Sequence, residues 1–252
     1  MSDTIYYKIL KEDLIHYGFQ YKLGLNIDIK EFNPSGSCLP GGLYFTDKEN
    51  IIKYLHFGEY IAELTIPEGA QIYEDTSKDK WKANKIFINK YYPIKEWDGW
   101  NDENICEVAV KNDGCALQFV TDKLITKKLC ELAVNYGYAL KYVPEELKTK
   151  ELCKIAVKDT GYTLEYVPNK LKTKELCEIS VKDTGNALKF VPEEFKTKEL
   201  CELAVKDSGY ALEYVPAELI TKELCESSIK DNGFALKAVP VEFKTKELCE
   251  LA

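Results

Sequence analysis

The clearest feature of the sequence is a pattern of apolar and polar positions that recurs about every 24 residues from residue 102 onward. In most copies, Leu, Cys, Ala and Val hold the same places between Lys and Glu, and a Gly and a Pro follow at nearly fixed distances. One cysteine marks each copy, with a single interval of 23 residues, at Cys106, Cys130, Cys153, Cys177, Cys201, Cys225 and Cys249. A fixed period of this length is typical of solenoid repeats.

Each copy carries the sequence signals of two short helices. In the copy that begins at Thr197, this threonine is a good N-cap, and apolar residues at helical spacing predict a first helix over 198–207. Gly209 is expected to end that helix in the left-handed conformation. Residues 210–215 are expected to form a second helix, which Pro216 closes. Neither helix is long enough to be stable alone in water, so stacking between copies must stabilise both.

Residues 102–252 are therefore predicted to form an all-α solenoid of 24-residue helix-pair repeats, with six near-complete repeats and a partial one. The repeat cysteines are expected to be buried thiols, because Cys among leucines behaves as a small apolar residue. Packed helices lie about 8–10 Å apart, which is beyond the reach of a disulfide. No metal site is expected, since each repeat offers one Cys at the repeated position, and His16 and His56 lie outside the array.

A small α+β domain is predicted over residues 1–95, before the array. Its expected strands are Tyr6–Leu10, Leu43–Phe45, Tyr60–Ile66, Ala70–Tyr73 and Lys85–Ile88. Residues 47–57 are expected to form a helix, with Thr46 as its N-cap and Gly58 as its end.

An aromatic connector over residues 96–101 joins the two predicted domains. It contains Trp97 and Trp100, whereas a free tether is usually polar. We therefore expect both tryptophans to pack between the domain and the first repeat.

The charge of the chain narrows the range of partners. All 34 basic residues are lysine, against 42 acidic residues, for a net charge of −8. Nucleic-acid binding depends on clustered positive charge and favours arginine, so no nucleic-acid partner is expected. No apolar run approaches the roughly 18 residues of a membrane span, and the N-terminus does not resemble a signal peptide. Nine cysteines without a disulfide pattern also indicate an intracellular protein with no membrane partner.

The repeat, with the consensus Thr-Lys-Glu-Leu-Cys-x-x-Ala-Val-Lys-Asp-x-Gly, resembles a short helical repeat of giant DNA viruses of amoebae. That repeat is classified as a domain of unknown function. The resemblance covers residues 102–252 and implies a non-enzymatic scaffold that binds a protein partner in the infected host cell or the virion. Residues 16–21 and 33–46 resemble a module that precedes ankyrin and other repeats in mimivirus-type proteins. Neither resemblance carries a catalytic residue.

A second resemblance offers an alternative function for the N-terminal domain. His16, followed by the segment Gly42-Leu43-Tyr44-Phe45 and then by a predicted helix and strand, is similar to ADP-ribosyltransferases of the poly(ADP-ribose) polymerase type. This resemblance implies NAD as the cofactor, His16 as the residue that holds its nicotinamide ribose, and Tyr44 in the nicotinamide pocket. Glu63 and Glu74 are the candidates for the catalytic glutamate. No motif places either one, and a structural role for the same residues is the other interpretation.

Three further groups are candidates for function. An aromatic residue follows the glycine in several repeats and would form either a binding surface or part of the core, at Tyr138, Tyr162, Tyr210 and Phe234. The partial repeat is expected to leave Leu248, Cys249 and Ala252 partly exposed and to allow end-to-end self-association. Cys38 would be a nucleophile only with a base beside it, and is otherwise an inert thiol.

Overall fold

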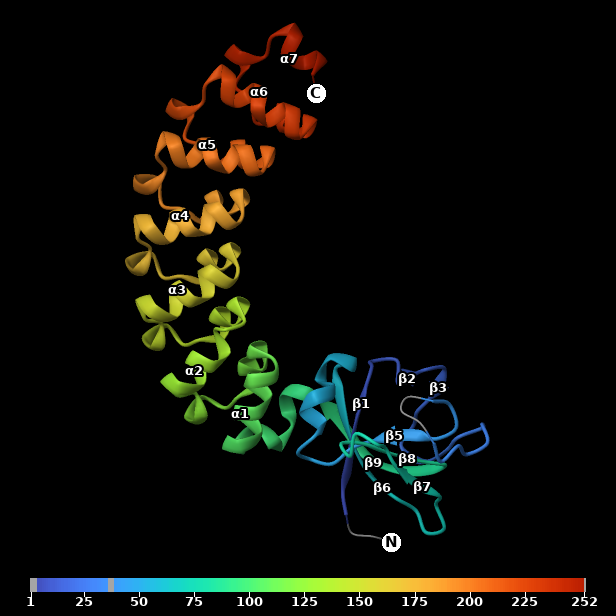
Figure 1. The fold of residues 1–252 in the computed structure, drawn as a ribbon. Coiled ribbons are helices and arrows are strands. Elements are labelled where there is room, and N and C mark those ends of the chain that lie inside the picture. The colour runs from blue at the N-terminus through green and yellow to red at the C-terminus, as the bar shows by residue number, and fades with distance from the viewer. Residues whose placement is uncertain (1–3, 36–38, 252) are drawn as a thin grey trace. The chain divides into compact units, whose positions relative to one another are not determined.

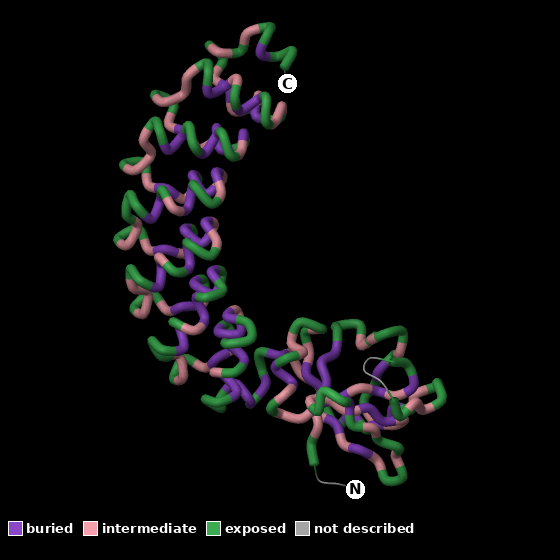
Figure 2. The backbone as a smooth tube through the Cα atoms, in the orientation of Figure 1, coloured by how far each residue is buried: buried purple, intermediate pink, exposed green. Residues whose placement is uncertain are grey.

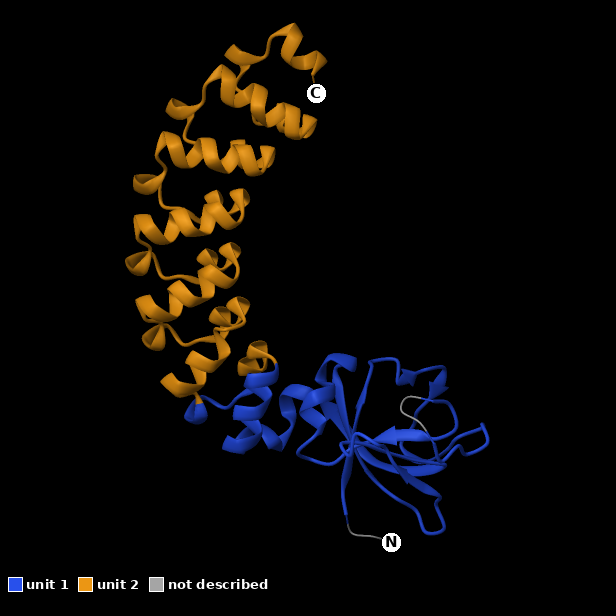
Figure 3. Ribbon diagram, in the orientation of Figure 1, with its two compact units in different colours: residues 1–112, 119–124 blue, residues 113–118, 125–252 orange. Residues whose placement is uncertain are grey.

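The computed structural model describes residues 4–35 and 39–251 (Figure 1). Contacts divide the chain into two compact units, shown in Figure 3. The first unit contains residues 1–112 and 119–124, and the second contains residues 113–118 and 125–252. The first helix of the repeat pattern, α1 (Glu103–Asn112), therefore belongs to the same unit as the strands.

A four-stranded antiparallel sheet forms the centre of the first unit. Its order is β1 (Tyr6–Leu10), β6 (Tyr60–Thr65), β9 (Lys85–Pro93) and β4 (Gly24–Ile27). The register pairs Tyr6 with Leu64 and Gly24 with Ile88. Side chains two residues apart on a strand share a face, so Ile86 and Ile88 of β9 enter the core together with Leu64.

A second sheet and a hairpin complete the strands of this unit. The sheet has the order β5 (Leu43–Phe45), β8 (Trp81–Ala83) and β7 (Ile72–Glu74). The hairpin consists of β2 (Ile15–His16) and β3 (Phe19–Gln20). Leu43, Phe45 and Ala83 of the second sheet belong to the same buried cluster as the four-stranded sheet.

The predicted strands of the N-terminal domain are largely confirmed, and its predicted helix is corrected. Strands at residues 6–10 and 43–45 have the expected bounds, whereas β4 and β8 were not expected because such short segments carry little pattern. The helix expected over 47–57 is a shorter 3₁₀ helix, η1 (Ile51–Phe57). Thr46 does not cap it. Thr46 instead forms a backbone bridge with Tyr7, and its hydroxyl donates to the Asp79 carbonyl at 2.5 Å.

The tryptophans of the connector are part of a buried core within the first unit. Trp97 is 2% exposed and its ring contacts that of Tyr7 on β1, with centroids 6.0 Å apart. Trp100 is 1% exposed, stacks on Phe119 at 5.2 Å and donates its indole N–H to the Ile94 carbonyl at 2.7 Å. The thiol of Cys106 in α1 donates to the Trp100 carbonyl at 3.4 Å. The indoles therefore connect the sheet to the first repeat helix, as expected.

The array is confirmed as an all-α stack of repeats. Its helices in the second unit are α2 (Lys127–Ala133), α3 (Lys150–Asp159), α4 (Lys174–Asp183), α5 (Lys198–Asp207), α6 (Lys222–Asp231) and α7 (Lys246–Glu250). Each begins after a threonine whose hydroxyl accepts a hydrogen bond from a leucine N–H, as Thr197 does from Leu200. Helix α5 has the bounds predicted for it, because cap and apolar spacing are local signals. Figure 2 shows the buried positions of these helices.

The second helix of each repeat differs from the expectation. In the repeat of α5 it is a 3₁₀ helix over Gly209–Tyr214, and a further 3₁₀ turn over Ala217–Leu219 follows Pro216. Gly209 is not left-handed, and the extended residue Ser208 ends α5. A Cβ on Gly209 would lie 2.3 Å from the Ser228 carbonyl oxygen of the next repeat. Glycine is therefore required by close packing and not by backbone conformation.

Two kinds of polar contact recur between successive repeats. The glycine N–H donates to an aspartate of the following repeat at 2.7–2.8 Å, in the pairs Gly137–Asp159, Gly161–Asp183, Gly185–Asp207 and Gly209–Asp231. A lysine ammonium donates to a carbonyl at the end of the next 3₁₀ helix at 2.8–2.9 Å, in the pairs Lys148–Tyr166, Lys172–Phe190 and Lys196–Tyr214. These bonds satisfy backbone groups at helix ends that would otherwise be left without partners.

The burial of the repeat cysteines and of the last helix agrees with the expectations except at Leu248. Six of the repeat cysteines are buried, Cys249 is exposed, and all the described cysteines are free. Leu248 is only 2% exposed, so the expected exposure is wrong for this residue, because it packs inward like the leucine before each repeat cysteine. Ala252 lies outside the described residues. Within the described chain, no helix has the length and apolar character needed to cross a membrane.

Candidate functional site

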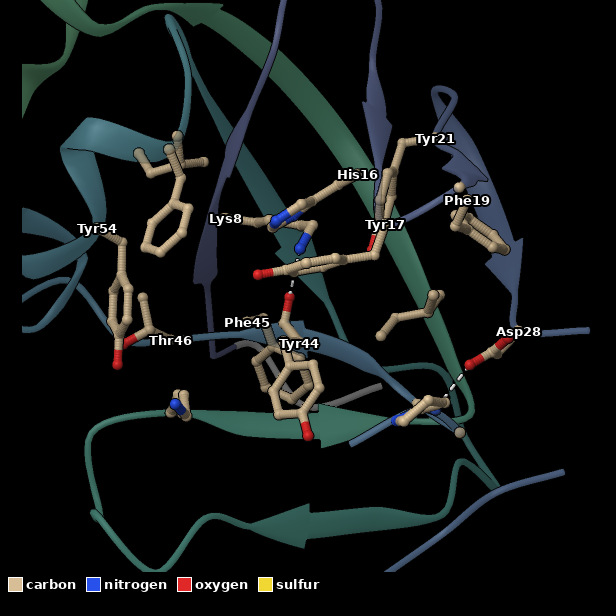
Figure 4. Close-up of a pocket in the computed structure, with 18 of the residues that line it drawn as sticks. Lys8, His16, Tyr17, Phe19, Tyr21, Asp28, Tyr44, Phe45, Thr46 and Tyr54 are labelled. Carbon is tan, nitrogen blue, oxygen red and sulfur yellow. Dashed lines mark hydrogen bonds between the residues drawn. The ribbon is translucent and has the colours of Figure 1, made fainter. Parts of the chain in front are cut away.

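A cavity of about 440 Å³ lies in the first unit (Figure 4). Its walls come from β1, the β2–β3 hairpin, residues 39–46 and η1. Nine aromatic residues contribute to the lining, namely Tyr7, His16, Tyr17, Phe19, Tyr21, Tyr44, Phe45, Tyr54 and Phe57. A concave, mostly apolar site with a few polar groups is the usual form of a small-molecule site.

The hairpin places an exposed aromatic ring at the edge of this cavity. Tyr17 and Gly18 form its two-residue turn with positive φ angles of 49° and 78°, as a tight hairpin requires. The Tyr17 ring is stacked on His16, with centroids 4.5 Å apart, yet Tyr17 is 83% exposed. One face of an aromatic residue therefore lies open beside the cavity.

Lysines surround the aromatic wall. Lys8 of β1 is 5% exposed, and its ammonium donates to the Tyr44 carbonyl at 2.9 Å. It lies 4.7 Å from the centroid of the Tyr21 ring, a cation–π distance. Burial lowers the pKa of Lys8 to about 7. Lys80 also lines the cavity, with its ammonium 6.0 Å from the centroid of the Tyr44 ring.

One acidic side chain, Asp28, lines the cavity among the residues that the structure describes. Its carboxylate accepts the N–H of Gly42 at 2.6 Å and that of Lys30 at 3.0 Å. Lys30 lines the cavity as well. The carboxylate is thus occupied in shaping the glycine loop, and lysines outnumber acids around the cavity.

The structure brings two of the four candidate catalytic residues together. His16 and Tyr44 both line the cavity, and burial together with the nearby lysine charges lowers the pKa of His16 to about 4. Glu63 lies elsewhere on β6, where it accepts the Tyr92 hydroxyl at 2.5 Å and pairs with Lys90 at 3.2 Å. Glu74 lies exposed on β7. Neither glutamate lines the cavity.

Sequence reasoning missed Lys8, Tyr17 and Tyr54 as residues of this cavity. Lys8 had no readable signal, because side chains alternate along a strand, and a lysine between Tyr7 and Ile9 would be expected on the outer face, whereas the structure buries all three. Tyr17 and Tyr54 had no signal either. Their positions depend on the turn geometry and on the placement of η1 against β1, which are tertiary features.

The second unit presents an aromatic stripe, defined by the residues that follow the repeat glycines: Tyr138, Tyr162, Tyr210 and Phe234. Tyr138 is 50% exposed, Tyr210 49% and Phe234 70%, so these rings are not part of the core. Tyr162 is half-buried against Phe190 of the next repeat, with centroids 6.2 Å apart. The stripe is interrupted by Asn186.

The repeat thiols are not suited to chemistry. Burial raises the pKa of Cys130, Cys153 and Cys177 to about 11, so the reactive thiolate is scarce at neutral pH. No cluster of described residues could hold a metal ion. Cys38, the loop thiol, lies outside the described residues.

Comparisons with known proteins identify relatives for parts of the chain. Residues 126–172 and 173–220 match a family described as a domain of unknown function, DUF4116. The chain is 40% identical over 105 residues to "Putative ankyrin repeat protein R868" of Acanthamoeba polyphaga mimivirus, which is 40% of this chain and 52% of that protein. It is 41% identical over 104 residues to "Uncharacterized protein R869" of the same virus, which is 40% of this chain and 75% of that protein.

These relatives are matched to different extents. A third, "Putative ankyrin repeat protein R229" of the same virus, is 31% identical over 109 residues, or 38% of this chain and 36% of that protein. The first of the three is covered over about half of its length. No solved structure matches the chain.

Proposed function

This chain belongs to a family of giant-virus proteins, and two of its own segments match a domain of unknown function. We propose that it is a scaffold that binds a partner protein through its helical repeats. The names of several relatives contain the words "ankyrin repeat protein" and state no partner. Their viral origin supports a place of action in the infected host cell or the virion.

The observation that carries the proposal is the exposure of the aromatic stripe. Tyrosine and phenylalanine usually bury their rings, whereas Tyr138, Tyr210 and Phe234 are about half-exposed or more. Exposed aromatic residues at protein surfaces are typical of interaction sites, where tyrosine contributes a large part of the binding energy. The stacking of equal repeats sets such rings at regular intervals, which favours an extended partner surface.

The proposal is tested by removing the stripe. A triple variant with Tyr138→Ser, Tyr210→Ser and Phe234→Ser keeps the buried core intact, because all three side chains are exposed. Wild type and variant are used to capture proteins from cells infected with a giant virus, and bound proteins are quantified by mass spectrometry. We expect the variant to lose its partner by at least about tenfold, the effect of losing one strong contact residue.

A matched control changes exposed apolar residues outside the stripe. Ile155→Ser, Leu203→Ser and Val241→Ser alter side chains that are 40%, 40% and 82% exposed. This variant should retain the partner. Equal capture by all three proteins, or equal loss in stripe and control variants, would contradict a role of the stripe.

ADP-ribosyl transfer by the first unit stays a prediction. The placement of His16 and Tyr44 in one cavity supports it, and the distance of Glu63 and Glu74 from the lining does not. Titration of the full chain with NAD tests it, with formation of free nicotinamide as the sign of catalysis.

A further inference from the structure

We infer that the cavity of the first unit binds a free nucleotide, with the base stacked on Tyr17 and the phosphate held by the lysines. This inference is independent of the partner proposed for the repeats. It concerns binding alone, and no bond is made or broken in it.

The size and lining of the cavity fit a ligand of this kind. Small-molecule sites commonly measure about 300–1,000 Å³, and this cavity measures about 440 Å³. Its walls carry nine aromatic residues, with charged groups at a few points. Planar rings are the ligands that such walls favour, because aromatic faces stack on one another.

Tyr17 is the strongest indication of a stacking ligand. It is 83% exposed and lines the edge of the cavity. Its ring stacks on His16 but is not buried in the core, so core packing does not explain an aromatic residue at this position.

The charge around the cavity selects an anion. The chain has a net charge of −8, yet Lys8, Lys30 and Lys80 line the cavity against Asp28 alone among the described residues. The Asp28 carboxylate already accepts two backbone N–H groups. Lys8 uses one of its three donors on the Tyr44 carbonyl. A cavity that reverses the sign of the whole chain attracts a negatively charged ligand.

Ring and anion together indicate a nucleotide, which joins a planar base to a phosphate. A nucleic-acid strand offers the same two groups at its end. The acidic chain disfavours a polyanion, since such binding depends on many positive contacts. The cavity is therefore assigned to a free nucleotide.

The experiment measures binding of AMP to the full chain by calorimetry, with adenosine and inorganic phosphate as partial ligands. Tyr17→Ala and Lys80→Met should each weaken AMP binding by about tenfold, the loss expected for one stacked base or one phosphate contact. Tyr17→Phe should restore the affinity, because it keeps the ring. Lys90→Met changes a lysine of β9 that does not line the cavity, and should bind like wild type.

The outcomes separate the possible ligands. Saturable AMP binding that is tighter than adenosine binding and follows these variants supports the inference. Absence of AMP binding, or equal binding of adenosine, overturns it. Binding of NAD but not of AMP would also overturn it and would favour the ADP-ribosyltransferase interpretation. Tighter binding of a short oligonucleotide than of AMP would overturn it in favour of a nucleic-acid strand. None of these results depends on the aromatic stripe.

Discussion

Lys8 is a lysine buried in the first unit, where its positive charge is disfavoured. Its ammonium is removed from water, and the Tyr44 carbonyl and the Tyr21 ring replace only part of the lost solvation. His16 lies close enough for the two charges to disfavour each other. The cavity thus holds a lysine whose charge is sensitive to pH near neutrality.

The pKa of Lys8 makes stability depend on pH in a defined window. The pKa is about 7 in the folded chain and 10.5 for an unperturbed lysine, so the unfolded chain binds more protons between these values. Raising the pH from 7 towards 10 therefore favours the folded state, by up to about 1.4 kcal/mol per pH unit. Below pH 7 both states are protonated and the contribution is constant.

Lys8→Met removes this dependence. Urea unfolding at several pH values should show that the difference in free energy of unfolding between wild type and variant changes steadily from pH 7 to 10. The variant should be the more stable at pH 7, by about 2 kcal/mol or more, because an apolar side chain replaces a buried charge. Lys90→Met, at a lysine whose side chain is 61% exposed, serves as the control. A constant difference between Lys8→Met and wild type would show that Lys8 remains charged in the folded chain.

At the scale of the element, the repeat is held by contacts between a 3₁₀ helix and the next α-helix. In four repeats, the glycine that begins the 3₁₀ helix both donates to an aspartate and lies against a carbonyl of the following repeat, as Gly161 does. Ser180 stands where the neighbouring repeats have alanine. The same close approach accounts for this serine, because its hydroxyl donates to the Gly161 carbonyl at 2.8 Å. The junction between repeats is thus polar at its edge and apolar within.

Gly161→Ala should weaken one junction strongly. The new Cβ would lie 2.4 Å from the Ser180 carbonyl oxygen, so two backbones must move apart. We expect a loss of about 2 kcal/mol or more in the free energy of unfolding, followed by circular dichroism in urea. Replacement of a helical glycine by alanine is otherwise stabilising, so the sign is informative.

Gly24→Ala is the matched control. A Cβ there would contact nothing within 4 Å, and only the positive φ of 84° opposes it. Its cost should be about 1 kcal/mol. A cost for Gly161→Ala no larger than this would contradict the packing role of the repeat glycine.

At the scale of the whole molecule, stability in the second unit should follow position in the stack. Helix α4 packs on both α3 and α5, whereas α7 has only five residues. In such an array, stability is approximately a sum of repeat and nearest-neighbour contributions. The first unit is not built from nearest-neighbour contacts in this way, because its strands pair across long stretches of sequence.

Hydrogen exchange followed by mass spectrometry should reveal this order. Amides of α4 are expected to exchange at least about tenfold more slowly than those of α7, because opening α4 breaks two junctions. In Gly161→Ala, faster exchange should be confined to α3, α4 and the 3₁₀ helix between them, with α6 unchanged. Uniform exchange rates along the array would indicate that it unfolds as one cooperative body.

The sequence by itself determined the array and the bounds of α5. Thr197 and the spacing of Leu200, Cys201 and Ala204 are local signals, and a threonine cap and a helical apolar face act within one turn or two. Repetition at a fixed period predicted that the repeats stack, since such short helices are stable only against their neighbours. The strand at residues 6–10 was readable for the same local reason.

Only the tertiary structure decided the second helix of each repeat and the cavity. Gly209 has the sequence signal of a left-handed cap, but a carbonyl from 19 residues later fixes its role, and no local pattern encodes that distance. Likewise His16 and Tyr44 share a cavity while Glu63 and Glu74 do not, because strand register sets which faces meet. Long-range pairing brings together Lys8, Tyr17 and Tyr54, which the chain separates, and so the candidate site exists only in the folded protein.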